Sequence, residues 1–382
     1  MRIGVLPLES RNLFTNEKAI AAPTTLAGTI AEGLAARGHE VDVYAASDSQ
    51  LQNATLKSFG LGSIYAQYAE KLNNDPAYYT RLMVEYELYM ASAIIEASGQ
   101  YDIIHAHDPA RLMYFSSFAQ CPLVYTYHGS EPITDHQEPI QQARLKRFHA
   151  SSLFVAISDY QRSELQPSFQ VVDRIYHGID LQQVPFQPIG SDEILFVGRL
   201  GTQKQPDLAI RVAQEVKKRI RLIGELSRSV SNAAYVKQLE ILLKDSMVEY
   251  VGVLSQSEVY TAYQARLLIH PVKFEEGFGM VLIEAMATGT PVVAYARGAI
   301  PEVIEDGVTG FIVNPSLEGR RGNWIVQATG KAGLCEAVER IYALSNDAYK
   351  AMRQACRKRV EDYFSASRML DDYERLFVKL VA

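Results

Sequence analysis

The feature that most constrains the fold is an alternation of short apolar segments with longer segments of helical periodicity along nearly all of the 382 residues. Segment Thr24–Arg37 repeats apolar residues at helical spacing and ends at Gly38, a residue type that often terminates helices. Alternating strands and helices with short connections predict a parallel, doubly wound α/β sheet. In the first half of the chain we expect strands at Ile3–Leu6, Glu40–Tyr44, Ile103–Ala106, Leu123–Thr126, Leu153–Ala156 and Asp173–Tyr176.

A polar, proline-marked stretch at residues 177–193 interrupts this alternation, and a second series follows it. The pattern therefore predicts two similar Rossmann-like domains, 1–180 and 181–364. Residues 365–382 form an amphipathic pattern, and we expect a helix there that packs back on the first domain. The strands expected in the second domain are Ile194–Val197, Arg221–Ile223, Tyr250–Gly252, Leu267–His270, Val292–Tyr295 and Gly310–Val313.

The composition narrows the class of protein. A net charge of −6 gives no global positive field that would recruit nucleic acid. The three cysteines, Cys121, Cys335 and Cys356, are widely spaced and fit a reducing compartment better than disulfides or a zinc site. The start of the chain lacks the pattern of a signal peptide, and no window reaches the 18 or more apolar residues of a membrane span. We expect a cytoplasmic protein.

The segment IHPVKFEEGFGMVLIEAMATGTPVV, residues 269–293, indicates the ligand. It has the pattern of a buried strand, a glycine-punctuated loop (Gly277, Phe278, Gly279) and the start of a helix, where free N–H groups and the helix dipole favour an anion. Glu276 and Glu284 suit sugar hydroxyls rather than phosphate. A ligand with an anionic centre and hydroxyls at both ends is a nucleotide-sugar. Leu282 occupies the position of the third glycine of a nicotinamide-binding motif, which argues against that cofactor.

A second candidate group follows the strand at 194–197. Gly198 ends this strand, and Arg199 and Lys204 lie in the turn before a helix expected at Pro206–Lys217. Two cations at the carboxyl end of a strand suit a diphosphate. The alternative is a solvated loop with ordinary surface charges.

Histidines form the third group. His105 and His107 alternate on one strand and could share a metal ion, but hydrogen-bonded structural histidines are the more common case. No Asp-x-Asp metal clamp follows a strand, so we expect no metal. His128 ends a strand just before Gly129, a position from which its side chain can contact a transferred group. Basic residues at 144–149 face either solvent or an acidic membrane.

With these motifs the chain resembles the retaining glycosyltransferases of family 4, the "glycosyl transferases group 1" of the GT-B fold, over nearly its whole length. The resemblance is strongest in EEGFGMVLIEAMATGTPVVA and GAIPEVIEDGVTGFIV. It extends to FVGRLGTQK, RGHEVDVYA, DIIHAHD, TYHG and HGID.

The resemblance implies two domains that face each other across a cleft, with the acceptor on the first and the donor on the second. It implies that Glu276 binds hydroxyls of the donor sugar and that Glu284 binds the ribose. It also implies that Arg199 and Lys204 neutralise the charge of the diphosphate. It also implies that His128 lines the sugar pocket, and that Gly277, Phe278, Gly279 and Gly198 surround the donor. The reaction implied retains the anomeric configuration without a metal, with a UDP-sugar as the expected co-substrate, no other cofactor and a hydroxyl acceptor (a glycan, a lipid-linked sugar or a small molecule).

One departure from the family stands out. The family usually has a Gly-Gly pair where this chain has Ala21-Ala22, so Ala22 is our candidate for the donor contact there. Alanine resists positive φ, so this loop could follow another path, and the polar segment Leu8–Ile20 could form an acceptor-specific flap. A catalytically silent nucleotide-sugar-binding relative and a sugar-nucleotide epimerase of similar architecture are the alternatives. The base, sugar, acceptor, linkage, oligomeric state and any peripheral contact with the inner face of the membrane stay open.

Overall fold

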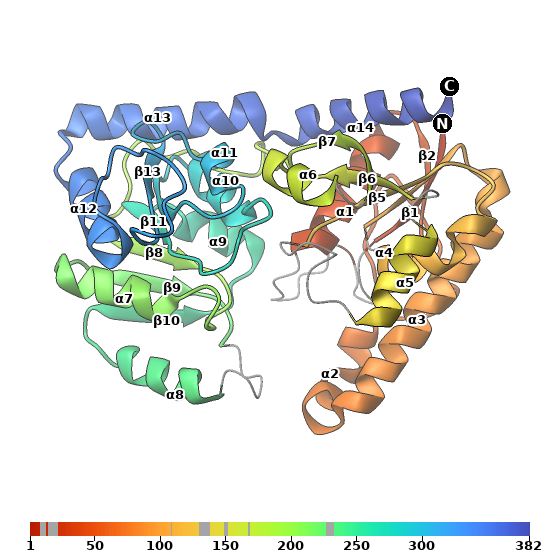
Figure 1. The fold of residues 1–382 in the computed structure, drawn as a ribbon, viewed down its shortest axis with the longest axis horizontal. Coiled ribbons are helices and arrows are strands. Elements are labelled where there is room, and N and C mark those ends of the chain that lie inside the picture. The colour runs from red at the N-terminus through yellow and green to blue at the C-terminus, as the bar shows by residue number, and fades with distance from the viewer. Residues whose placement is uncertain are drawn as a thin grey trace. The chain divides into compact units, whose positions relative to one another are not determined.

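In the computed structural model we describe residues 1–7, 13, 22–107, 109–129, 138–148, 152–166, 169–226 and 233–382. The chain divides into two compact units, and each is built on its own parallel sheet (Figure 1). Among the described residues, the first unit contains those up to His177 together with Ala366–Ala382, and the second contains Gly178–Ser365.

The first unit has a seven-stranded sheet of order β3-β2-β1-β4-β5-β6-β7, with all neighbouring strands parallel. Its central strands are fully buried because helices cover both faces. The strands are β1 (Arg2–Leu6), β2 (Glu40–Val43), β3 (Thr55–Leu56), β4 (Ile103–Ala106), β5 (Leu123–Thr126), β6 (Leu153–Ala156) and β7 (Gln170–Arg174).

Two apolar clusters hold these helices on the sheet. One face packs against α1 and α14, through residues such as Ile30 and Phe377. The other packs against α3, through residues such as Ile94. The helices of this unit are α1 (Ala22–Ala36), α2 (Ile64–Asn74), α3 (Pro76–Glu96), α4 (Pro109–Leu112), α5 (Pro139–Phe148), α6 (Asp159–Leu165) and α14 (Ala366–Val381), with 3-10 turns η1 (Ser98–Gln100) and η2 (Met113–Phe118).

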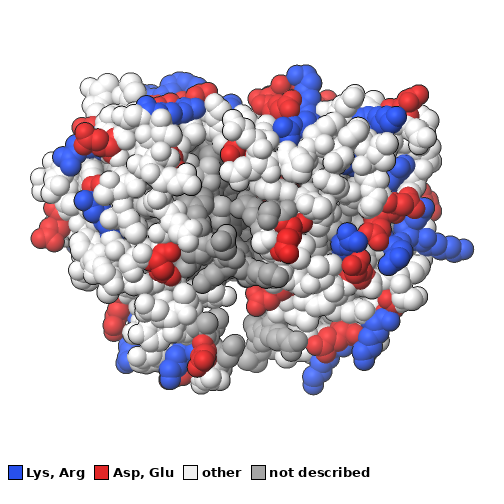
Figure 2. Space-filling model, turned by 180° about the vertical axis from the view of Figure 1, so that it is seen from behind, with Lys and Arg blue, Asp and Glu red and all other residues white. Residues whose placement is uncertain are grey.

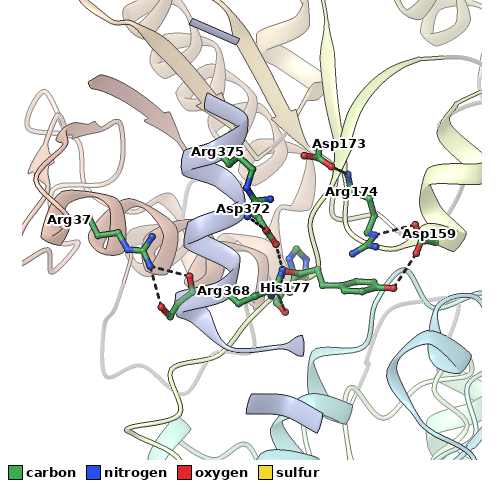
Figure 3. Close-up of polar contacts among 10 residues, drawn as sticks. Arg37, Asp159, Asp173, Arg174, His177, Arg368, Asp372 and Arg375 are labelled. Atoms are coloured by element: carbon green, nitrogen blue, oxygen red, sulfur yellow. Dashed lines mark hydrogen bonds and ion pairs between the residues drawn. The ribbon is translucent and has the colours of Figure 1, made fainter. Parts of the chain in front are cut away.

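The C-terminal helix α14 is fixed to the first unit by polar contacts as well as by its apolar face (Figure 3). Nη2 of Arg368 donates to the carbonyls of Tyr176 and His177 at 2.5 and 3.3 Å, and Nη1 pairs with Asp372 at 2.6 Å. Nη1 of Arg37, the residue after α1, lies 2.5 Å from a carboxylate oxygen of Glu374. The helix expected to pack back on the first domain is confirmed.

The second unit has a six-stranded parallel sheet of order β10-β9-β8-β11-β12-β13. A large apolar cluster lies between this sheet and helices α7, α8 and α12. The strands are β8 (Ile194–Val197), β9 (Ile220–Ile223), β10 (Val248–Gly252), β11 (Leu267–His270), β12 (Val292–Tyr295) and β13 (Gly310–Val313). The helices are α7 (Pro206–Glu215), α8 (Ala233–Leu242), α9 (Gln256–Ala262), α10 (Met280–Ala287), α11 (Ile300–Val303), α12 (Gly330–Tyr342) and α13 (Asn346–Tyr363).

The predicted fold class, two doubly wound parallel α/β domains, is confirmed. The predicted strand at 173–176 is shifted, since β7 spans Gln170–Arg174. Its ladder with β6 contains an irregularity between Phe154 and Val155, which brings Asp173 opposite Val155. The short edge strand β3 has no apolar alternation, so the sequence did not indicate it. The expected flap at 8–20, apart from Leu13, and Ala21 lie outside the described residues.

Two surface properties bear on partners. On the face drawn in Figure 2, Lys and Arg side chains are interspersed with Asp and Glu, in keeping with the small net charge of −6. None of the helices in the described ranges is both long and apolar enough to cross a membrane.

Candidate active site

The residues predicted for donor binding lie where the strand order of the second sheet reverses. The chain adds β9 and β10 on one side of β8, and β11, β12 and β13 on the other. Ligands of open α/β sheets bind beyond the carboxyl ends of the strands at such a reversal. Gly198 and Arg199 directly follow β8, and the loop with Glu276 follows β11, the strand that pairs with β8.

Lys204 and Glu276 form an ion pair in this site. Nζ of Lys204 lies 2.8 Å from Oε2 of Glu276, and Nε2 of His270, the last residue of β11, lies 3.2 Å from the same oxygen. The main chain joins the two loops as well, because the N–H of Lys273 donates to the carbonyl of Gln203 at 2.9 Å. The loop after β8 and the loop after β11 therefore form one structure.

The electrostatics keep Glu276 ionised. Burial alone would raise the pKa of Glu276, but the Lys204 charge and the His270 hydrogen bond outweigh it and lower the pKa to about 2. Burial lowers the pKa of His270, so this histidine is neutral at neutral pH. Since an ionised carboxylate only accepts, His270 donates through Nε2–H. Both donors use Oε2, and Oε1 of Glu276 accepts no hydrogen bond from any residue that the structure describes.

Glu275 anchors the loop that presents Glu276. Its carboxylate binds Nη1 of Arg297 at 2.9 Å, Nη2 of Arg321 at 2.7 Å and the N–H of Gly298 at 2.6 Å. Gly298 has a φ of +54°, and a Cβ there would lie 2.2 Å from the carbonyl oxygen of Glu276. This close approach requires glycine and holds the loop against the turn after β12.

The glycine-rich turn leads directly into α10. Gly279 precedes the helix with a φ of +97°, and a Cβ there would lie 2.7 Å from Leu282, so only glycine fits. Phe278 is buried and packs edge-on against Phe364 at 5.7 Å, while Gly277 is buried beside it. The first N–H groups of α10 have no acceptor within the helix, so they can serve an anionic ligand.

Glu284 lies about one turn into α10, which begins at Met280. The hydroxyl of Tyr263 donates to Oε2 of Glu284 at 2.7 Å. Arg199, in contrast, is exposed, and within the described part of the chain its guanidinium makes no hydrogen bond or ion pair. Arg199 therefore carries a guanidinium without a side-chain partner among the described residues, in the same loop as the paired Lys204.

In the first unit His105, His107, His128 and His177 form an array in which all but the half-buried His128 are buried. Nδ1 of His107 lies 2.9 Å from Nε2 of His128, and Nε2 of His105 lies 2.8 Å from the hydroxyl of Thr126. His128 stacks on His177, with ring centroids 5.2 Å apart. Burial lowers the pKa of His105 to about 3 and that of His128 to about 4, so both are neutral at neutral pH.

These contacts favour the hydrogen-bonded interpretation of His105 and His107 over a shared metal. No group of three or more His, Cys, Asp or Glu side chains within the described ranges is arranged to hold a metal ion. All three cysteines are free thiols. Ala22 begins α1, and its side chain lies outside the described residues.

Sequence reasoning missed three members of this site: His270, Tyr263 and Glu275. His270 had a weak signal, since it ends a predicted strand just before the acidic loop. Tyr263 had none, because its partner is defined only by three-dimensional packing. Glu275 lies in the EEGFG motif, but the spacing of that motif does not indicate its arginine partners.

Comparisons with known proteins agree with this architecture. The profile of "Glycosyltransferase Family 4" matches residues 24–183, and that of "Glycosyl transferases group 1" matches residues 181–319. A D-inositol 3-phosphate glycosyltransferase of Mycobacterium leprae (strain Br4923) is 36% identical over 129 residues, 33% of this chain and 30% of that protein. One from Kribbella flavida is 28% identical over 261 residues, 57% of this chain and 61% of that protein. The matches thus cover less than two thirds of these relatives.

Solved structures resemble the whole chain. Sucrose-phosphate synthase from Thermosynechococcus elongatus has a TM-score of 0.70 at 19% identity, covering 99% of this chain and 98% of that one. HepE from Anabaena, solved in complex with UDP-glucose, has a TM-score of 0.69 at 16% identity, with both chains fully covered. At these identities the structures show the fold, and the two family profiles together cover residues 24–319. The chain belongs to the family 4 glycosyltransferases of the GT-B fold.

Proposed function

We propose that this chain is a retaining, metal-independent glycosyltransferase, which moves a hexosyl group from a nucleoside-diphosphate donor to a hydroxyl of an acceptor. The observation that best supports this proposal is the state of Glu276. Its side chain is only 13% exposed, yet it is ionised, and its Oε2 is occupied by Lys204 and His270. Its Oε1 can therefore accept a hydrogen bond from a sugar hydroxyl at the switch point of the sheet.

The charges around this carboxylate suit a diphosphate. Arg199 supplies an exposed guanidinium next to Gly198, and Lys204 can contact a phosphate oxygen while it keeps its pair with Glu276. Fixed cations stabilise the negative charge that develops on the departing diphosphate, and they stabilise the transition state more than the bound substrate. The backbone N–H groups of Phe278 and Gly279 lie at the start of α10, where the positive end of the helix dipole also favours the diphosphate.

The reaction balances without a protein base. The bond between the anomeric carbon and the diphosphate oxygen breaks, and a bond from that carbon to the acceptor oxygen forms on the same face. The proton of the acceptor hydroxyl passes to the departing phosphate oxygen. Glu276 orients the sugar, Glu284 binds the ribose, and neutral His128 contacts the transferred sugar.

Relatives suggest the first substrates to test. HepE was solved with UDP-glucose, which makes a UDP-sugar the first donor. The matched curated proteins are named D-inositol 3-phosphate glycosyltransferases, so a phosphorylated cyclitol belongs in the acceptor panel beside glycans and lipid-linked sugars. We expect the reaction to occur in the cytoplasm, with peripheral membrane contact if the acceptor is a lipid.

The test is transfer in EDTA, followed by proton NMR of the anomeric signal. UDP-glucose and the acceptor panel should give an acceptor-dependent product with the donor's α configuration, and Glu276→Gln should abolish its formation. A β product, or turnover only after metal is added, would contradict the proposal. Donor conversion without any acceptor would indicate an epimerase, and donor binding without turnover across the panel would indicate a silent relative.

A further inference from the structure

Tyr263 lies outside every motif of the sequence, yet it contacts a central residue of the site. It follows α9, and its ring is fully buried. Its hydroxyl donates to Oε2 of Glu284 at 2.7 Å. Burial raises the pKa of Tyr263 well above its ordinary value, so the phenol keeps its proton and remains a donor.

The backbone of Tyr263 is bound to the same helix that holds Glu284. Its carbonyl accepts hydrogen bonds from the hydroxyls of Thr288, at 3.2 Å, and Thr290, which are fully buried beyond the C-terminal end of α10. Its N–H donates to the carbonyl of Val259 at 2.9 Å, which continues α9. Tyr263 is thus tied to the α10 segment at two points, by its side chain and by its carbonyl.

In this arrangement the two carboxylate oxygens of Glu284 have different surroundings. Oε2 is occupied by the tyrosine hydroxyl, whereas Oε1 accepts no hydrogen bond from any other residue in the described ranges. The side chain is only half-buried, so a ligand can approach it. A carboxylate with one oxygen held by a buried donor has fewer orientations open to it, so its other oxygen is restricted in the directions it can take.

We infer that Tyr263 is a positioning residue for the nucleotide, which holds Glu284 ionised and oriented so that Oε1 meets the ribose hydroxyls. This inference rests on the proposed function, in which Glu284 binds the ribose of the donor. It adds a residue that does not touch the substrate but determines how well the chain distinguishes a ribose from a sugar without those hydroxyls.

The charge state of Glu284 supports the same role. Burial raises the pKa of this carboxyl, and the Tyr263 hydrogen bond opposes that rise. The other ionisable groups packed nearby are Tyr260 of α9, and Arg353 and Arg357 of α13, whose guanidiniums bind carbonyls at the C-terminal end of α10. Tyr263 is therefore the group that stabilises the ionised form by direct contact.

The test compares two ligands on four proteins by isothermal titration calorimetry. The ligands are UDP and its 2′,3′-dideoxy form, or the GDP or ADP pair if one of those nucleotides binds more tightly. The proteins are the wild type, Tyr263→Phe, Glu284→Gln and the control Tyr260→Phe, which removes a hydroxyl from another buried tyrosine, in α9 itself. The ratio of the two dissociation constants cancels any titration of the phosphates, which are common to both ligands.

We expect the wild type and Tyr260→Phe to prefer the ribonucleotide. Tyr263→Phe should weaken ribonucleotide binding about tenfold and leave binding of the dideoxy form unchanged, because one hydrogen bond to a charged group is lost. As the pH is lowered, the variant should lose its preference for the ribonucleotide at a higher pH than the wild type does, since the pKa of Glu284 rises without the phenol. A purely structural role for Tyr263 would weaken binding of both ligands alike and leave the pH dependence of their ratio unchanged.

The outcomes separate this inference from the proposed function. If Glu284→Gln removes the preference but Tyr263→Phe leaves both the preference and its pH dependence as in the wild type, the role of Tyr263 is refuted and the ribose site stands. If Glu284→Gln leaves the preference intact, Glu284 does not bind the ribose, and both the assignment and this inference fail.

Discussion

Replacing Lys204 with methionine should destabilise the second unit. The substitution keeps a similar side-chain length and removes the charge, which leaves Glu276 with His270 alone. The fall in the pKa of Glu276 from 4.5 to about 2 corresponds to about 3 kcal/mol in favour of the ionised form, and the charge of Lys204 is the largest single stabilising cause. The side chains keep exposures of 23% and 13%, so we expect a loss of about 2 kcal/mol, below the ~3–5 kcal/mol for a fully buried pair.

The single tryptophan of the chain, Trp324, provides the assay. It lies in the second unit, so its fluorescence follows the unfolding of the unit that contains the pair. For a unit of this size, about 2 kcal/mol lowers Tm by roughly 4–8 °C. Lys237→Met is the matched control, because Lys237 is an exposed lysine of α8 in the same unit, and its replacement should change Tm little.

The pH dependence and a double variant test the reasoning behind this number. Glu276 has a depressed pKa in the folded state, so its contribution is complete above about pH 4.5 and is lost as the pH falls toward 2. The difference between wild type and Lys204→Met should therefore be constant from pH 8 to about 5 and shrink below that. In a Glu276→Gln background Lys204→Met should cost much less. An equal cost in both backgrounds would refute the coupling that we derive from the structure.

Three further predictions concern the rest of the molecule. Glu284→Ala should raise the dissociation constant of the donor, whereas Arg199→Ala should lower kcat more than donor affinity. Titration calorimetry measures the affinities and steady-state kinetics measures kcat. Equal, negligible effects of both substitutions would show that the assignments are wrong. Because burial depresses the pKa of His105 to about 3 and of His128 to about 4, the first unit should lose stability as the pH falls from about 6.5 toward 4. The measurement is the protection of β4 and β5 against hydrogen exchange, taken relative to the intrinsic exchange rate at each pH. Protection that does not decrease over this range would contradict the prediction. Arg368→Met removes the donor to two carbonyls and should increase exchange in α14 while α12 stays unchanged, and equal exchange in both proteins would rule out the anchoring role.

Much of the fold follows from local pattern. Buried strands such as β8 and β11 are short apolar runs, and parallel sheets require such runs because helices cover both faces. Helix α14 was predictable from its apolar stripe, which has to be buried against another element. The shifted β7 was not, because its register depends on an irregularity in the neighbouring strand.

The site was predictable in part. The switch-point rule brings the turn after β8 next to the loop after β11, so the proximity of Lys204 and Glu276 follows from topology. The individual hydrogen bonds do not, since they depend on rotamers and loop paths. The contact of Tyr263 with Glu284 joins the end of one helix to the middle of another, and neither residue has a spacing that indicates its partner.

The most direct test of the proposed site is titration calorimetry of UDP-glucose, GDP-glucose and ADP-glucose in EDTA with the wild type and Glu276→Gln. We predict that one of the three binds at one site per chain, with an affinity that added Mg²⁺ leaves unchanged, and that Glu276→Gln weakens binding of the sugar nucleotide more than binding of the nucleoside diphosphate alone. A metal requirement for binding, or equal losses for the sugar nucleotide and the diphosphate, would contradict the role of Glu276 as the carboxylate that holds the donor sugar.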